Sequence, residues 1–147
     1  MNLSELILEG KIADVSIGSH LKNTSGLEII THQEGDIPGL RGLYIDDLFF
    51  EIVVLDDFIK GIHFDFRYEM KAPNTFEVDD IRMALDDNTT LIDLANHLKK
   101  MNIAFEIVEP TFESRKIRLL KYKSNFYFNN ENDKLFKLTN NDFSFHD

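Results

Sequence analysis

Cysteine is absent from the 147-residue chain, and only three prolines occur. Without cysteine there can be no disulfide, no thiolate metal site and no cysteine nucleophile. The prolines are too scattered to mark a hinge, and no internal repeat or low-complexity linker divides the sequence. We therefore expect one domain over residues 1–147, with a frayed tail from about residue 140.

Long apolar runs are also lacking. No stretch approaches the roughly 20 apolar residues that cross a bilayer as a helix. The N-terminal sequence MNLSELILEGK carries Glu5 and Glu9 in place of the basic start of a signal peptide. Together with the absence of cysteine, these features favour a cytoplasmic protein that has no membrane partner.

Positive charge is scarce, since 16 Lys and Arg residues face 26 Asp and Glu residues, for a formal net charge of −10. An acidic chain repels phosphate backbones, which argues against direct binding of nucleic acid. Residues 28–93 contain 16 acidic and 5 basic residues, whereas residues 99–123 contain 7 basic and 3 acidic ones. Two interpretations of the acidic span stay open: a functional face, or charge that serves solubility alone.

Signatures of catalysis are missing as well: G-x-S-x-G, Walker A, G-x-G-x-x-G, H-E-x-x-H and EF-hand patterns do not occur. His63 and Asp65 share one face of a predicted strand and could ligate a metal, but a third ligand at recognisable spacing is not found. We therefore predict that the chain is not an enzyme and uses no metal or other cofactor. A metal-dependent enzyme using His63 and Asp65 is the less favoured alternative.

The sequence is rich in residues that build a core and form strands: 43% of its residues are hydrophobic, and 13 are Phe. Residues 48–55 form a nearly continuous apolar run, and residues 62–68 alternate between apolar and polar side chains, as a half-buried strand does. Further strands are expected over residues 103–109, 116–122 and 124–138, the last range forming a hairpin. Alternating aromatics such as Phe64, Phe66 and Tyr68 are interpreted as core, although they could line a ligand cavity in a small-ligand-binding or scaffold module.

One helix is strongly indicated, from Thr90 to Met101. Thr90 and Asp93 form a capping box, and apolar residues follow at helical spacing. A second, short helix is expected from Asp80 to Leu85. The predicted fold is α+β: a predominantly antiparallel sheet, made of a meander plus a C-terminal hairpin, with one principal helix packed on it.

Four Asp-Asp pairs occur in the acidic span, and we treat all eight residues as candidate partner-binding residues. The first two pairs separate apolar runs, which predicts turns, and their substitution should cost about 0.5–2 kcal/mol if a cap-like bond to the backbone is lost. The last two pairs lie in a polar connection, where fewer structural duties suit them to act on a partner through long-range potential. The pairs are Asp46-Asp47, Asp56-Asp57, Asp79-Asp80 and Asp86-Asp87.

The order of three segments resembles small bacterial immunity proteins of toxin–immunity pairs, including contact-dependent growth inhibition systems. The segments are IPGLRGLYIDDLFFEIVVLDDFIKGIHFDF, TTLIDLANHLKKMNIAFEI and SNFYFNNENDKLFKL, within residues 11–138. The resemblance implies a protein that binds a cognate toxin domain, often a nuclease with a basic surface, and blocks it. It assigns no individual residue, because these families share no invariant catalytic residue.

Overall fold

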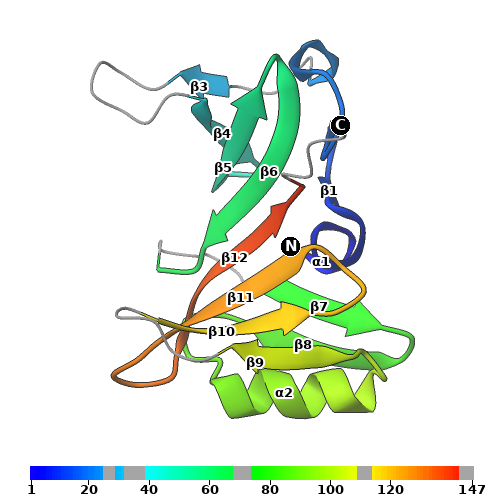
Figure 1. Cartoon of the computed structure of the whole chain (residues 1–147), viewed down its shortest axis with the longest axis vertical. Coiled ribbons are helices and arrows are strands. Elements are labelled where there is room, and N and C mark those ends of the chain that lie inside the picture. The colour runs from blue at the N-terminus through cyan, green and yellow to red at the C-terminus, as the bar shows by residue number, and fades with distance from the viewer. Residues whose placement is uncertain (25–28, 32–38, 68–73, 109–113, 143–147) are drawn as a thin grey trace.

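The computed structural model describes residues 1–24, 29–31, 39–67, 74–108 and 114–142. Its main feature is an eight-stranded sheet in the order β3-β4-β5-β6-β12-β11-β10-β9 (Figure 1). All neighbouring strands in it are antiparallel. These strands are β3 (Ile29–Thr31), β4 (Leu40–Ile45), β5 (Leu48–Leu55), β6 (Phe58–Asp65), β9 (Phe105–Val108), β10 (Ser114–Leu119), β11 (Ser124–Asn129) and β12 (Leu135–Asn141).

Two meanders make up this sheet, β3 to β6 and β9 to β12. They join where the last strand of each pairs with the other, from Asp65 opposite Lys137 to Gly61 opposite Asn141. β9 and β10 lie where the sequence predicts strands, and they extend the expected C-terminal hairpin of β11 and β12 into a meander. The predicted class is confirmed: the fold is α+β, with a mostly antiparallel sheet and one principal helix.

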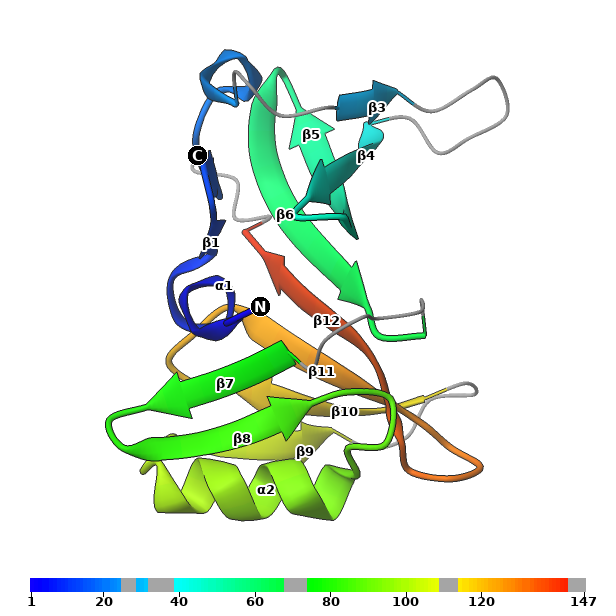
Figure 2. The same ribbon diagram turned by 180° about the vertical axis from the view of Figure 1, so that it is seen from behind.

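That helix, α2 (Leu91–Lys100), has the ends that the sequence predicts. The Thr90 side chain accepts from the Asp93 backbone N–H while the Asp93 carboxylate accepts from the Thr90 N–H, which completes the capping box. Its buried face consists of Leu91, Leu94, Ala95 and Leu98. Seen from behind, α2 runs beneath the strands β8 and β9 (Figure 2).

The segment from Asp80 to Leu85 is not a helix. It forms β8 (Ile81–Leu85), which pairs with β7 (Asn74–Val78) in a separate two-stranded sheet. Met83 and Leu85 are buried while Arg82 and Ala84 are exposed, so the segment has the period of a strand. The hairpin crosses one face of the β9–β12 half, as both ribbon views show (Figures 1 and 2).

The N-terminal segment packs against the junction of the two meanders. It comprises α1 (Ser4–Glu9), β1 (Lys11–Ile12), β2 (Val15–Ser16) and the 3-10 turn η1 (Leu21–Asn23). At the other end of the chain, β12 continues to Asn141, and Asn140 is 3% exposed. The chain is therefore still a buried strand at residue 140, where the sequence suggested fraying, and residues 143–147 lie outside the described residues.

Aromatic side chains form much of the core. The ring of Phe64 lies 4.9 Å from that of Phe50 and 4.8 Å from that of Phe66, and each of these three residues is at most 2% exposed. The interpretation of Phe64 and Phe66 as core is thus confirmed, while Tyr68 lies outside the described residues. These rings lie on the buried, inner face of the sheet. The candidate site is on the opposite face.

Candidate functional site

The first two Asp-Asp pairs form the tight turns of the N-terminal meander. Asp46 and Asp47 join β4 to β5, and Asp56 and Asp57 join β5 to β6, each pair enclosed by directly paired residues. All four have positive φ, at 50°, 65°, 52° and 65°. Positive φ at both central residues defines the type I′ hairpin turn, which Asp tolerates better than most residues. The predicted turn role is therefore confirmed.

The expected cap-like bonds of these four carboxylates are not formed. All four residues are exposed, and within the described part of the chain no hydrogen bond or ion pair involves their side chains. Asparagine also adopts left-handed φ readily, so Asp→Asn changes here should remove charge at little cost in stability.

The other two pairs have more structural duties than the sequence suggested. Asp79 and Asp80 form the two-residue turn between β7 and β8, and Asp79 has a φ of 54°. Asp86 accepts a hydrogen bond from the Asn88 backbone N–H at 2.8 Å, at the entrance to α2. These pairs therefore do not lie in one polar connection with few structural roles, as the sequence suggested, but at a hairpin turn and at the start of the segment that leads into α2.

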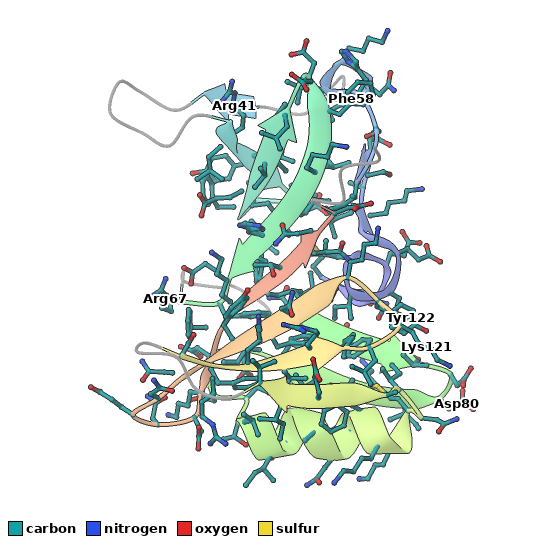
Figure 3. The ribbon with its side chains drawn as sticks, in the orientation of Figure 1. Arg41, Phe58, Arg67, Asp80, Lys121 and Tyr122 are labelled. Carbon is teal, nitrogen blue, oxygen red and sulfur yellow. The ribbon has the colours of Figure 1, made fainter. Side chains whose placement is uncertain are left out.

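The four pairs do not gather into one acidic patch. Because β5 has eight residues rising about 3.3 Å each, Asp46-Asp47 and Asp56-Asp57 lie about 25–30 Å apart. Asp80 and Phe58, which follows Asp57, lie toward opposite ends of the molecule (Figure 3). Asp86-Asp87 follow β8 at the end remote from Asp79-Asp80.

Between the first two turns runs a row of apolar side chains that the sequence analysis missed. Tyr44 pairs with Phe49 next to one turn, Leu55 pairs with Phe58 next to the other, and Val53 lies between them on the same side of β5. Tyr44 is 43%, Phe58 41% and Leu55 36% exposed. We call this surface, with its two Asp-Asp turns, the meander face.

The signal for this face was present in the sequence. Residues 48–55 are apolar at consecutive positions, which means that both sides of the strand carry apolar groups. One side, with Phe50, Ile52 and Val54, is buried in the core. In an antiparallel meander the other side can face solvent, and here it does. Exposed aromatic residues beside charged turns are typical of protein-binding surfaces.

The continuation of this face across β6 and β12 is polar. Glu51 lies opposite His63, and His63 opposite Thr139. The His63 Nε2 lies 2.7 Å from the Asn141 Oδ1. Residue 61 must be glycine for this contact, because a Cβ there would lie 2.2 Å from the same oxygen.

His63 and Asp65 each have a hydrogen-bond partner within the chain. Asp65 receives hydrogen bonds from the Arg67 backbone and guanidinium, at 2.8 and 2.6 Å. Burial acts to raise the pKa of the Asp65 carboxyl, but the hydrogen bonds and charge of Arg67 outweigh it and hold that pKa below its usual value. In the part of the chain that the structure describes, no three His, Asp or Glu side chains gather closely enough to hold a metal ion.

The lowered pKa of His63 predicts how the stability of the chain depends on pH. Burial lowers the pKa of its imidazole below 6.5; the nearby Lys137 also lowers it, while Asn141 and Glu51 act in the opposite direction. The unfolded chain therefore takes up this proton first, and stability should fall as pH drops through 6.5 toward the lower folded pKa. Urea unfolding between about pH 8 and about pH 5 should show a smaller loss for His63→Gln than for the natural chain. Equal losses of unfolding free energy in the variant and the natural chain would contradict this prediction.

Comparisons with known proteins return no match: no family model matches the sequence, and neither a curated protein nor a solved structure does. Among the described residues, no helix combines the length and apolar character needed to cross a membrane as a helix. The function has to be inferred from the residues and geometry of the chain itself.

Proposed function

We propose that this chain is an immunity protein, which binds a basic toxin domain through the meander face and blocks it. The observation that carries the proposal is the meander face itself, an exposed apolar row with one exposed Asp pair at each of its two ends. The order of segments in the sequence resembles that of toxin-neutralising immunity proteins. This resemblance supports toxin binding as the role of the surface.

The apolar row supplies the anchors that a stable complex needs. Tyr44 and Phe58 have rigid rings, and each is already held by a neighbour: the Tyr44 ring lies 5.4 Å from that of Phe49, and the Phe58 ring 5.2 Å from that of His20. Held rings lose little conformational freedom when a partner covers them. Aromatic side chains dominate the energetics of most protein interfaces, so Tyr44→Ala or Phe58→Ala should each raise the Kd of the complex about 30-fold.

The carboxylates select the partner. Four aspartates flank the row and Glu51 lies within it, so a complementary surface carries Lys or Arg at matching places. The formal net charge of −10 adds a long-range attraction for a basic domain and speeds the encounter. Asp79, Asp80, Asp86 and Asp87 contribute only to that long-range attraction, since they lie outside the meander face, in the β7–β8 turn and the connection from β8 to α2.

The direct test uses the protein whose gene lies immediately upstream of the gene for this chain, because an immunity gene normally follows that of its toxin. Expression of its C-terminal domain in bacteria should arrest growth, and coexpression of this chain should restore it. The Tyr44→Ala, Phe58→Ala double variant should fold but fail to restore growth. If the chain neither binds that domain nor protects against it, the proposal fails.

The electrostatic part is tested by two variants of equal charge. One changes Asp46, Asp47, Asp56 and Asp57 to Asn; its control makes the same change at Asp79, Asp80, Asp86 and Asp87. In stopped-flow binding to the same domain, the first should slow association about tenfold at low salt, and the control less than about threefold. The association rate of the natural chain should fall steeply as salt screens the charges. Equal effects of both variants would place the binding surface elsewhere.

A further inference from the structure

A depression of about 650 Å³ lies on a part of the molecule that the meander face does not include. Its lining comes from the C-terminal end of α2, the segment before β9 and the turn between β10 and β11. Lys121 and Tyr122 of that turn lie side by side at the edge of the molecule (Figure 3). The volume is in the range of sites that hold small molecules, about 300–1,000 Å³.

The floor of the depression is apolar and its charged groups are all positive. Ile103 is 8% exposed, and Phe105 and Tyr122 are half-buried against the core. Lys99 and Lys121 are exposed and also line it, and none of the described residues that line it is acidic. An apolar floor with lysines around it suits a ligand that has an apolar body and an anionic end.

These two lysines differ from the basic residues of this acidic chain that are held in ion pairs. Four other cations are held in ion pairs, namely Arg67, Arg115, Arg118 and Lys123. Lys99 and Lys121 form no ion pair within the described residues. Their ammonium groups are therefore available to a ligand, and no internal carboxylate has to be displaced first.

The end of α2 would repel an anion if its carbonyl groups were bare, because a helix C-terminus carries partial negative charge. Here the chain reverses at Asn102, with a φ of 59°. The Ile103 N–H donates to the Leu98 carbonyl at 2.9 Å and the Asn102 N–H to the Lys99 carbonyl at 3.1 Å. These bonds occupy carbonyls of the last turn, and the lysines then determine the local charge.

We propose that this depression binds an apolar carboxylate, with its aromatic or branched aliphatic group on Ile103, Phe105 and Tyr122 and its carboxylate between Lys99 and Lys121. Such a group occurs in free small organic acids and at the C-terminus of a peptide that ends in an apolar residue. The proposed site goes beyond toxin binding and shares no residue with the meander face.

The probes are 3-phenylpropionate and its uncharged amide, followed by NMR of the isotope-labelled chain. The carboxylate should produce saturable shifts at the amides of Asn102, Ala104, Lys121 and Tyr122, and the amide should bind at least about tenfold more weakly, because it lacks the charge-assisted bonds. A short peptide ending in Phe, with a free or an amidated C-terminus, separates the two sources of the carboxylate. Shifts with the free-ended peptide assign the site to a chain terminus, and shifts with phenylpropionate alone assign it to a free acid.

Lysine variants provide a second test of the proposed site. Lys99→Gln and Lys121→Gln should each weaken the carboxylate about fivefold or more, and their combination should abolish saturable shifts. Lys100→Gln is the matched control: Lys100 is an exposed neighbour of Lys99 in the same helical turn but does not line the depression, so its effect should stay below about twofold. Equal binding of acid and amide, or equal effects of all three variants, would overturn the proposal.

Discussion

Replacing Phe64 with alanine should lower the free energy of unfolding by about 3–5 kcal/mol. The side chain is 2% exposed, and its ring contacts those of Phe50 and Phe66 at 4.9 and 4.8 Å. Removal of the ring leaves a cavity at the centre of the inner face and ends two aromatic contacts. Because domains are stable by only about 5–15 kcal/mol in total, this loss is a large fraction.

The measurement is urea unfolding followed by circular dichroism, and Phe58→Ala serves as control. Phe58 lies in the same strand, but it is 41% exposed, so its truncation should cost about 1 kcal/mol or less. The difference also shows that the residue proposed to anchor a partner can be removed without unfolding the chain. Similar losses for the two variants would mean that the inner face is not the core.

The elements with strong local signals were predicted well. The Asp46-Asp47 and Asp56-Asp57 turns follow from a residue type that tolerates positive φ between apolar runs, and α2 follows from its capping box and apolar spacing. The segment from Ile81 to Leu85 was misassigned because five residues are too few to separate a helical from a strand period. The Asp79-Asp80 turn before it is the better signal, since it closes a hairpin as the other two turns do.

The candidate site was predicted only in part, because it depends on contacts between distant residues. Local pattern cannot reveal that β6 pairs with β12, which brings Asn141 Oδ1 within 2.7 Å of His63 Nε2. Nor can it show which side of β5 stays uncovered, since that depends on where other elements pack. The Asp46-Asp47 and Asp56-Asp57 turns were predicted correctly, but the exposed rings of Tyr44 and Phe58 between them required the sheet register.

The second large effect concerns the contact between α1 and the sheet. Asn140 is 3% exposed and Ser124 is fully buried. The Asn140 Nδ2 donates to the Leu6 carbonyl at 3.0 Å and to the Ser124 Oγ at 3.1 Å, and that hydroxyl donates to the Ile7 carbonyl at 2.6 Å. Strands β11 and β12 thus bond two carbonyls in the last turn of α1. The Ile7 carbonyl is in the part of a helix that lacks internal partners, and the Leu6 carbonyl also accepts from the Gly10 N–H.

Asn140→Ala should therefore cost about 2 kcal/mol, through two lost hydrogen bonds and the unpaired groups left behind. The effect should concentrate in α1, where the Ile7 and Gly10 amides donate to Leu3 and Leu6. Hydrogen exchange at these two amides should become about 30-fold faster, as 1.4 kcal/mol corresponds to a factor of ten.

A double-mutant cycle with Ser124→Ala separates this network from a general loss of packing. Since Asn140 and Ser124 bond each other, the double variant should lose less stability than the sum of the two single losses, by about 0.5–1.5 kcal/mol. Asn96→Ala is the control, because Asn96 is exposed on α2 and alanine favours a helix. Unchanged exchange at Ile7 and Gly10 in Asn140→Ala would show that α1 is held by its apolar side chains, Leu3, Leu6 and Ile7, and does not depend on the polar network.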